Sequence, residues 1–172
     1  MRLTLAVLAI VGLGGLAAAQ HHHQPAHAPY AGMNQRGVKA LSEQQVVDLR
    51  AGRGMGLALA AELNGYPGPM HAIELADKLG LDAPTRRHLQ RLFEDMKAEA
   101  IPAGELLITR ETALDRAFAD RTISAEALNT LTALIGESQG QLRAIHLKYH
   151  LITADLMTSQ QRLHYAQLRG YR

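Results

Sequence analysis

The chain of 172 residues carries 18 Lys and Arg against 16 Asp and Glu, a formal net charge of +2, and 47% of its residues are hydrophobic. Charges of both signs are mixed along it, so neither nucleic acid nor an anionic membrane is expected as a partner. The sequence has no cysteine, which excludes disulfides and thiolate metal sites and leaves His, Met, Asp, Glu and backbone oxygen as metal ligands.

Residues 1–19 have the pattern of a cleaved signal peptide. Arg2 is followed by an apolar run over residues 3–16 and then by three alanines at 17–19, the small-residue pattern that a signal peptidase accepts. The run is shorter than the roughly 20 apolar residues that span a bilayer. We therefore expect an exported protein, cleaved near Ala19, with no transmembrane segment after cleavage.

Residues 20–40 form a His-rich tail that we expect to be disordered, because its Gln, Pro and Ala residues show no periodicity. A flexible His tract can wrap a borderline metal such as copper, nickel or zinc. The alternative is a solvated tail without a selected function. The histidines are His21, His22, His23 and His27.

Residues 41–68 predict a flexible, partly helical arm that packs on the main body. Ser42 caps a short helix, glycines at positions 52, 54 and 56 interrupt it, and a further apolar helical turn follows at 57–63. The glycine spacing does not indicate a nucleotide-binding loop, because no strand precedes it and no Gly-Lys-Ser/Thr follows. The Gly- and Pro-rich run at 65–69 ends the arm.

Residues 69–172 predict an all-α domain built on a long antiparallel helical hairpin. Apolar residues recur at helical spacing after Asp82 and again after Ser124, and the turn at 120–123 that joins the two helices is tight. Pro102 predicts a kink in the first helix. Shorter helices at 70–79 and 159–168 flank the hairpin.

Some apolar side positions fall outside the stripes that pair the two helices. Such leftover apolar surface usually means a partner, so we expect a curved homodimer. These positions are Ile101, Ile108, Leu134, Leu147 and Leu151.

Thr158 and Gln161 have the spacing of a capping box, in which the hydroxyl and amide side chains satisfy each other's backbone amides. A similar box occurs at 41–45 and a degraded one at 81–85. The run Met157-Thr158-Ser159-Gln160-Gln161 resembles the second Leu-Thr-x-x-Gln motif of the Spy/CpxP family of periplasmic chaperones and stress modulators, whose relatives include periplasmic heavy-metal sensors and resistance proteins. The resemblance covers about residues 69–171 and implies a periplasmic location and a dimer of curved hairpins.

His146 and His150 lie four residues apart in the second long helix, so their imidazoles share one side of it, a spacing suited to a metal ion or a proton-linked switch. They flank the apolar stripe, and the alternative is a pair of partly exposed histidines without function. The resemblance to the metal sensors matches His146 to a ligand and puts His150 where the sensors have Met. By the same resemblance, His71, Glu74 and Glu94 are the further candidate ligands.

Three functions remain open at this point. The first is a periplasmic heavy-metal resistance or sensor protein that binds a divalent ion (Cu, Ni, Zn or Co), with no organic cofactor and with a membrane signalling partner among its possible contacts. The second is an ATP-independent chaperone that holds unfolded periplasmic proteins on apolar and basic helix surface. The third is a structural partner in an envelope assembly. An enzyme is not expected, because no motif in the sequence indicates a catalytic set of nucleophile, base and acid.

Overall fold

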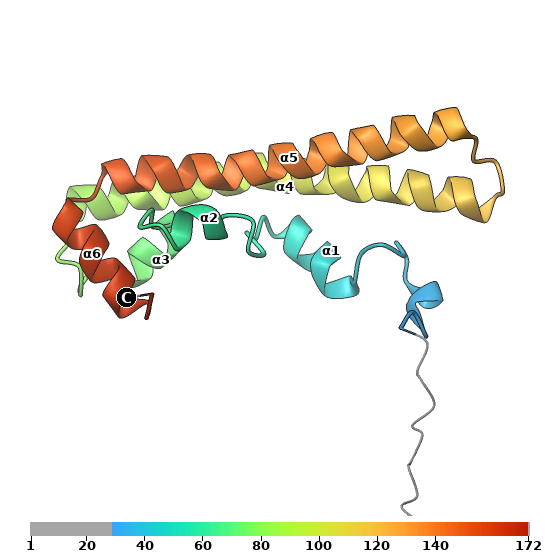
Figure 1. Ribbon diagram of the computed structural model, residues 1–172. Helices are drawn as coiled ribbons and strands as arrows, with labels where there is room; N and C mark the ends of the chain where they lie inside the picture. The colour runs from blue at the N-terminus through green and yellow to red at the C-terminus, as the bar shows by residue number, and fades with distance from the viewer. Residues whose placement is uncertain (1–28, 172) are drawn as a thin grey trace, which may run out of the picture. The chain divides into compact units, whose positions relative to one another are not determined.

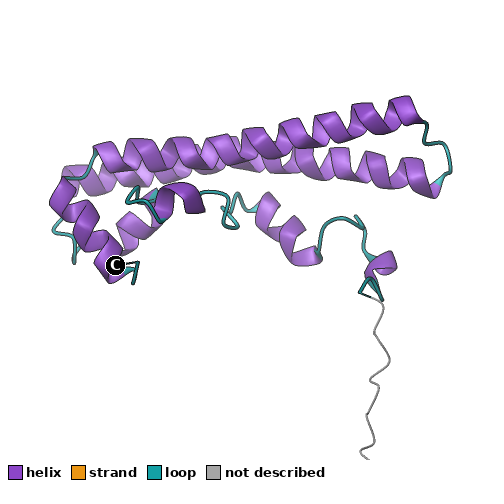
Figure 2. Cartoon of the chain, in the orientation of Figure 1, coloured by secondary structure: helices purple, strands orange, loops and turns teal. Residues whose placement is uncertain are grey.

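The computed structural model describes residues 29–171, and all regular secondary structure in this range is helical (Figure 2). The predicted signal peptide and the four tail histidines lie outside the described residues. Among the described helices, none has the length and apolar character needed to cross a membrane. After a short 3-10 turn at Met33–Gln35, the helices are α1 (Glu43–Arg50), α2 (Leu59–Glu62), α3 (Pro69–Glu74), α4 (Ala83–Ala119), α5 (Ala125–Asp155) and α6 (Ser159–Leu168).

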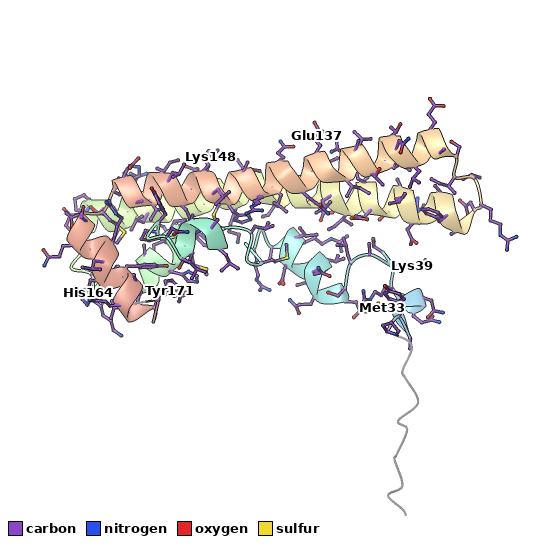
Figure 3. All side chains as sticks on the ribbon, in the orientation of Figure 1. Met33, Lys39, Glu137, Lys148, His164 and Tyr171 are labelled. Atoms are coloured by element: carbon purple, nitrogen blue, oxygen red, sulfur yellow. The ribbon has the colours of Figure 1, made fainter. Side chains whose placement is uncertain are left out.

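Helices α4 and α5 form the expected long hairpin, lying side by side along their lengths (Figure 1). Helix α4 continues through Pro102 as one helix, while the bend at this proline stays a prediction. Near the middle of the hairpin, the Arg110 guanidinium donates to the hydroxyl of Ser138 at 2.7 Å and to the carboxylate of Glu137 at 3.1 Å. Figure 3 shows Glu137 and Lys148 on the outer side of α5, away from α1 to α3.

The helix starts follow local side-chain chemistry, as the sequence predicts. The backbone amide of Gln161 donates to the Thr158 hydroxyl at 3.2 Å, and the side-chain oxygen of Gln161 accepts from the backbone amide of Thr158 at 2.9 Å. Ser42 and Gln45 make the same reciprocal pair at α1. Asp82 and Ser124 cap α4 and α5 with one bond each. A cap of this kind contributes about 1 kcal/mol.

Two apolar clusters stabilise the structure, one at the end of the hairpin where α4 begins and one near its middle. The first joins α3 and α6 to the end where α4 begins and α5 finishes, and Tyr165 of α6 is fully buried in it. Tyr165 therefore belongs to the core, whereas its neighbour His164 is exposed. The second cluster packs Leu41 and Leu49 of the arm against the middle of the hairpin. Helix α3 ends at Glu74, earlier than the expected 79, and turns lead from there to Gly80.

The arm is packed closely on α4. A Cβ added to Gly104 would lie 2.7 Å from the carbonyl oxygen of Leu49, so the two backbones meet at a position that only glycine permits. Ile108 is buried in the same cluster, and Ile101 is half-buried beside Gly52. The chain's own arm therefore covers Ile108, which corrects the expectation that this residue awaits a dimer mate, and it covers Ile101 in part.

Leu134 and Leu151 of the hairpin remain exposed. Apolar surface is thus still present on α5, but less of it than the helical pattern alone indicated. The homodimer stays a prediction.

Candidate functional site

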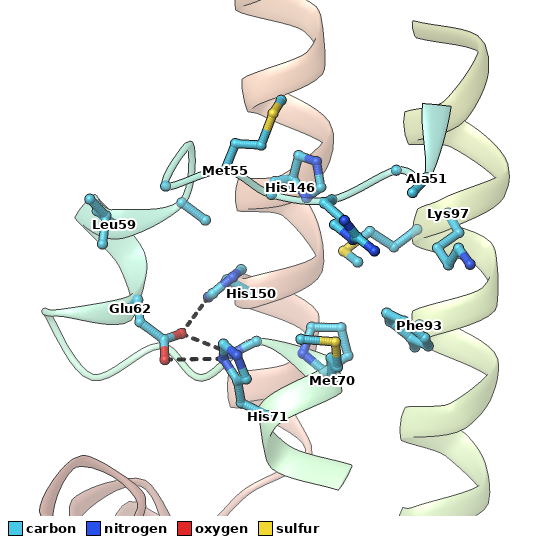
Figure 4. Close-up of a pocket in the computed structure, with 18 of the residues that line it drawn as sticks. Ala51, Met55, Leu59, Glu62, Met70, His71, Phe93, Lys97, His146 and His150 are labelled. Atoms are coloured by element: carbon cyan, nitrogen blue, oxygen red, sulfur yellow. Dashed lines mark hydrogen bonds and ion pairs between the residues drawn. The ribbon is translucent and has the colours of Figure 1, made fainter. Parts of the chain in front are cut away.

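A cavity of about 520 Å³ opens where the arm, α3 and the end of the chain meet the hairpin (Figure 4). Most of its wall is apolar, including side chains from the loop after α1, from α2, α3 and α4: Met55, Leu59, Met70, Phe93 and Met96. One carboxylate and three imidazoles lie among them, from Glu62, His71, His146 and His150, together with the basic residues Arg53, Lys97 and Arg169. A concave, mostly apolar site with a few converging polar groups is typical of a binding site.

Glu62, the last residue of α2, is the acceptor around which the polar groups gather. Its side chain is 7% exposed, and it accepts from the Tyr165 hydroxyl, from the Tyr171 hydroxyl at 3.1 Å and from the Gly68 amide at 3.3 Å. The Arg169 guanidinium lies 3.8 Å away. Burial and the bond to Glu62 raise the pKa of Tyr165 far above its usual range, so its hydroxyl remains a donor. Because buried carboxylates are rarely tolerated without partners, this set of donors is what holds Glu62 in place.

Both His71 and His150 turn Nδ1 toward this carboxylate. The distances to its oxygens are 3.6 Å from His71 and 3.5 Å from His150 (Figure 4). His150 Nδ1 also lies 2.7 Å from the carbonyl oxygen of Tyr66. A carbonyl only accepts, so Nδ1 of His150 carries a hydrogen, and in the neutral ring Nε2 keeps its lone pair.

The loop from Gly65 to Pro69 sets the position of His150. Gly65 has a φ of +86°, a left-handed conformation that favours glycine, and the chain then returns so that the Gly68 amide reaches Glu62. A Cβ on Gly68 would lie 2.9 Å from both Cε1 and Nε2 of His150. The loop therefore touches the imidazole so closely that any larger residue displaces one of them.

His146 is the most buried of the three histidines, with 2% of its surface exposed. Its Nε2 is buried and has no hydrogen-bond partner. Burial, and secondarily the neighbouring His150, lower the pKa of His146, so the neutral imidazole is favoured. An unpaired buried ring nitrogen costs free energy.

The cavity brings together three of the predicted metal ligands, namely His71, His146 and His150. The other two candidates from the helices are elsewhere. Glu74 and Glu94 are exposed and do not line the cavity, and Glu94 accepts a bond from Gln90 of its own helix at 2.9 Å. The sequence left open that His146 and His150 are partly exposed beside the stripe. Both are instead buried, because the arm covers their side of α5.

The sequence pattern did not predict Glu62, Arg169 and Tyr171 as residues of the cavity. The available signal for Glu62 was an acidic residue inside the apolar run 57–63, immediately before the Gly- and Pro-rich turn. Arg169 and Tyr171 gave no signal, because their role depends on the direction in which α6 leaves the hairpin.

Within residues 29–171, no group of three or more His, Asp and Glu side chains forms a ready-made metal site. The residues of the cavity thus offer separate imidazoles around one carboxylate. Comparisons with family models, with curated proteins and with solved structures found no match to this chain.

Proposed function

We propose that this protein binds a transition-metal ion in the cavity, through the imidazoles of His71, His146 and His150, as a periplasmic metal-resistance or metal-sensing protein. The observation that carries the proposal is the orientation of the rings. His71 and His150 direct Nδ1 to Glu62, while Nε2 of His146 is buried without a partner.

The contact of two rings with one carboxylate is the arrangement that prepares histidines for metal binding. A metal-ligating histidine almost always gives its other ring nitrogen to a carboxylate or carbonyl, which fixes the tautomer and raises the basicity of the ligating nitrogen. The Tyr66 carbonyl, 2.7 Å from Nδ1, supplies this partner to His150, and the Glu62 carboxylate lies 3.6 Å from Nδ1 of His71. Glu62 therefore acts as the group that orients the ligands, and its negative charge lowers the cost of placing a cation nearby.

The lowered pKa of His146 favours the same function. Protonated imidazole cannot coordinate a metal, so a site made of histidines loses affinity as the pH falls through the titration of its rings. Burial keeps His146 neutral at a lower pH than a free histidine. A metal bound through these rings should therefore dissociate as the pH falls, because each ring must be neutral to coordinate it.

Calorimetry of the purified protein against nickel, copper, zinc and cobalt tests the proposal. Replacing both His146 and His150 by alanine should remove the cavity site. Deleting residues 20–33 should leave it intact, because the tail histidines form a separate, weakly selective class with copper bound most strongly. His88→Ala is the matched control, since His88 is an exposed histidine of α4 outside the cavity. If the tail-deleted protein binds no ion more tightly than millimolar, the proposal is wrong.

Exposed apolar side chains favour a second function, the holding of unfolded proteins. From α1 to α3 the chain exposes six of them: Val47, Met55, Leu59, Leu63, Tyr66 and Met70. A surface of this kind binds extended apolar segments without any metal. Suppression of the aggregation of a model client should then be equal for the wild type and for a variant in which every histidine is alanine. Failure of both proteins to suppress aggregation at a stoichiometric ratio would refute this function.

A further inference from the structure

Helix α4 forms one side of the cavity, and on this side apolar surface adjoins a positive charge. Phe93 and Met96 line the cavity together with Lys97. The Lys97 ammonium lies 5.8 Å from the centre of the Phe93 ring, and Figure 4 shows these two side chains one turn apart on α4. The exposed side chains of Met55 and Leu59 belong to the same lining. The cavity therefore offers apolar contacts beside a cation.

Lys97 is a cation of this lining whose charge has no partner. Arg53 is paired with Asp48 at 2.6 Å, and Arg169 lies 3.8 Å from Glu62. Within the described part of the chain, by contrast, Lys97 forms no ion pair with an acidic side chain. An anion can therefore contact the Lys97 ammonium without displacing an existing partner.

The loop between α1 and α2 adds to the positive charge at this point. Gly52 has a φ of +65°, and a Cβ added to it would lie 3.5 Å from Cα of Lys97, so the loop backbone rests on α4. A Cβ added to Gly54 would lie 3.6 Å from Nδ1 of His146 on α5. Arg53 lies between these two glycines and also lines the cavity. The loop thus carries a second cation to the part of the cavity that Lys97 lines.

The balance of charge in the lining is positive. Three basic residues face a single acid, Glu62, whose carboxylate already accepts hydrogen bonds from two tyrosines and a backbone amide. A concave site lined by one sign of charge with apolar walls attracts a ligand of the opposite sign. A ligand that complements this cavity is therefore apolar over most of its surface and carries one negative charge.

We propose that the cavity binds a free monocarboxylate of the fatty-acid type, whose carboxylate accepts from the Lys97 ammonium while its apolar chain lies against Phe93 and Met96. The volume of about 520 Å³ is in the range of small-molecule sites, roughly 300–1,000 Å³. Burial of the chain supplies affinity, and the charge-assisted hydrogen bond selects the head group. This inference goes beyond the proposed function, because neither Lys97 nor Phe93 is a ligand of the metal.

Three probes with the same apolar chain and different head groups test the inference: decanoate, decanol and decyltrimethylammonium. Calorimetry of the full chain at about pH 8, where ordinary imidazoles are neutral, should show one decanoate site per chain. Decanol should bind about tenfold more weakly, and the cationic probe more weakly still, because a hydrogen bond between charged groups contributes about a factor of ten.

The variant that isolates the head-group contact is Lys97→Met, which removes the charge and keeps an unbranched side chain. It should weaken decanoate binding about tenfold and leave decanol binding unchanged, whereas Lys97→Arg should retain the preference for decanoate. Lys78→Met is the matched control, because Lys78 is an exposed lysine outside the cavity. Its binding of all three probes should equal that of the wild type.

The outcomes separate this inference from the proposed function. Decanoate affinity that is unchanged in Lys97→Met, or decanol that binds the wild type as tightly as decanoate, overturns the inference. Binding to phosphatidylglycerol vesicles without any binding of free decanoate overturns it as well. If decanoate binds through Lys97 but no metal binds, the proposed function fails and the inference stands. If a metal binds in a manner that requires His146 and His150 but decanoate does not bind, the reverse holds.

Discussion

Removing the Glu62 carboxylate should destabilise the whole end of the molecule in which α2, α3 and α6 meet. In Glu62→Ala, the buried Tyr165 hydroxyl and the buried Gly68 amide lose their acceptor, and Arg169 loses its nearby negative charge. A hydrogen bond to a charged group contributes about 1.5–3 kcal/mol, and a buried donor left without a partner costs about 1–3 kcal/mol. Breaking a buried ionic network typically costs about 3–5 kcal/mol, and this is the loss that we expect.

A loss of that size is a large share of the roughly 5–15 kcal/mol by which a domain is stable. Urea unfolding followed by far-ultraviolet circular dichroism measures it. Glu62→Gln should lose less, because the amide retains one oxygen acceptor.

The control for this prediction is Glu137→Ala. Glu137 also contacts an arginine, but its side chain is 66% exposed, so its loss should cost no more than about 1 kcal/mol. Glu62→Ala within about 1 kcal/mol of the wild type would show that the carboxylate does not hold this region together.

Two further predictions concern the packing and pH dependence of the hairpin. Gly104→Ala should lower the free energy of unfolding by about 1–3 kcal/mol, because the new Cβ would lie 2.7 Å from the Leu49 carbonyl oxygen. Gly136→Ala, where nothing lies within 4 Å of the new Cβ, should raise the free energy of unfolding by up to about 1 kcal/mol. Thermal unfolding of the two variants distinguishes the steric effect from the effect of helix propensity. Burial raises the pKa of the Glu111 carboxyl above its ordinary 4.5, so as the pH rises above 4.5 the unfolded state releases its proton before the folded state, and stability falls. Glu111→Gln should therefore stabilise the protein more at pH 7 than at pH 4, and an equal gain at both values in urea unfolding would contradict this.

The hairpin and the helix starts could be predicted from the sequence because the interactions that determine them are local. A capping box joins residues three apart, as in Thr158 and Gln161, and an apolar stripe repeats within one helix. The tight turn at 120–123 then leaves only an antiparallel arrangement for α4 and α5. The candidate ligands His146 and His150 were found by the same local spacing.

The arm and the polar centre of the cavity depended on contacts that the sequence pattern does not encode. Glu62 and Tyr165 are 103 residues apart, and no periodicity in either segment indicates that they meet. Residues 51–58 lack a helical stripe, so their packing over α5, which buries His146, could not be inferred.

The sequence by itself therefore determined an all-helical hairpin with its caps and a pair of histidines on one side of α5. Only the tertiary structure decided that Glu62, rather than Glu74 or Glu94, lies beside His150, and that Ile108 is covered by the chain's own arm. The physical reason is that helix formation is governed by residues three or four positions apart. The burial of a particular side chain instead depends on which distant segment packs over it.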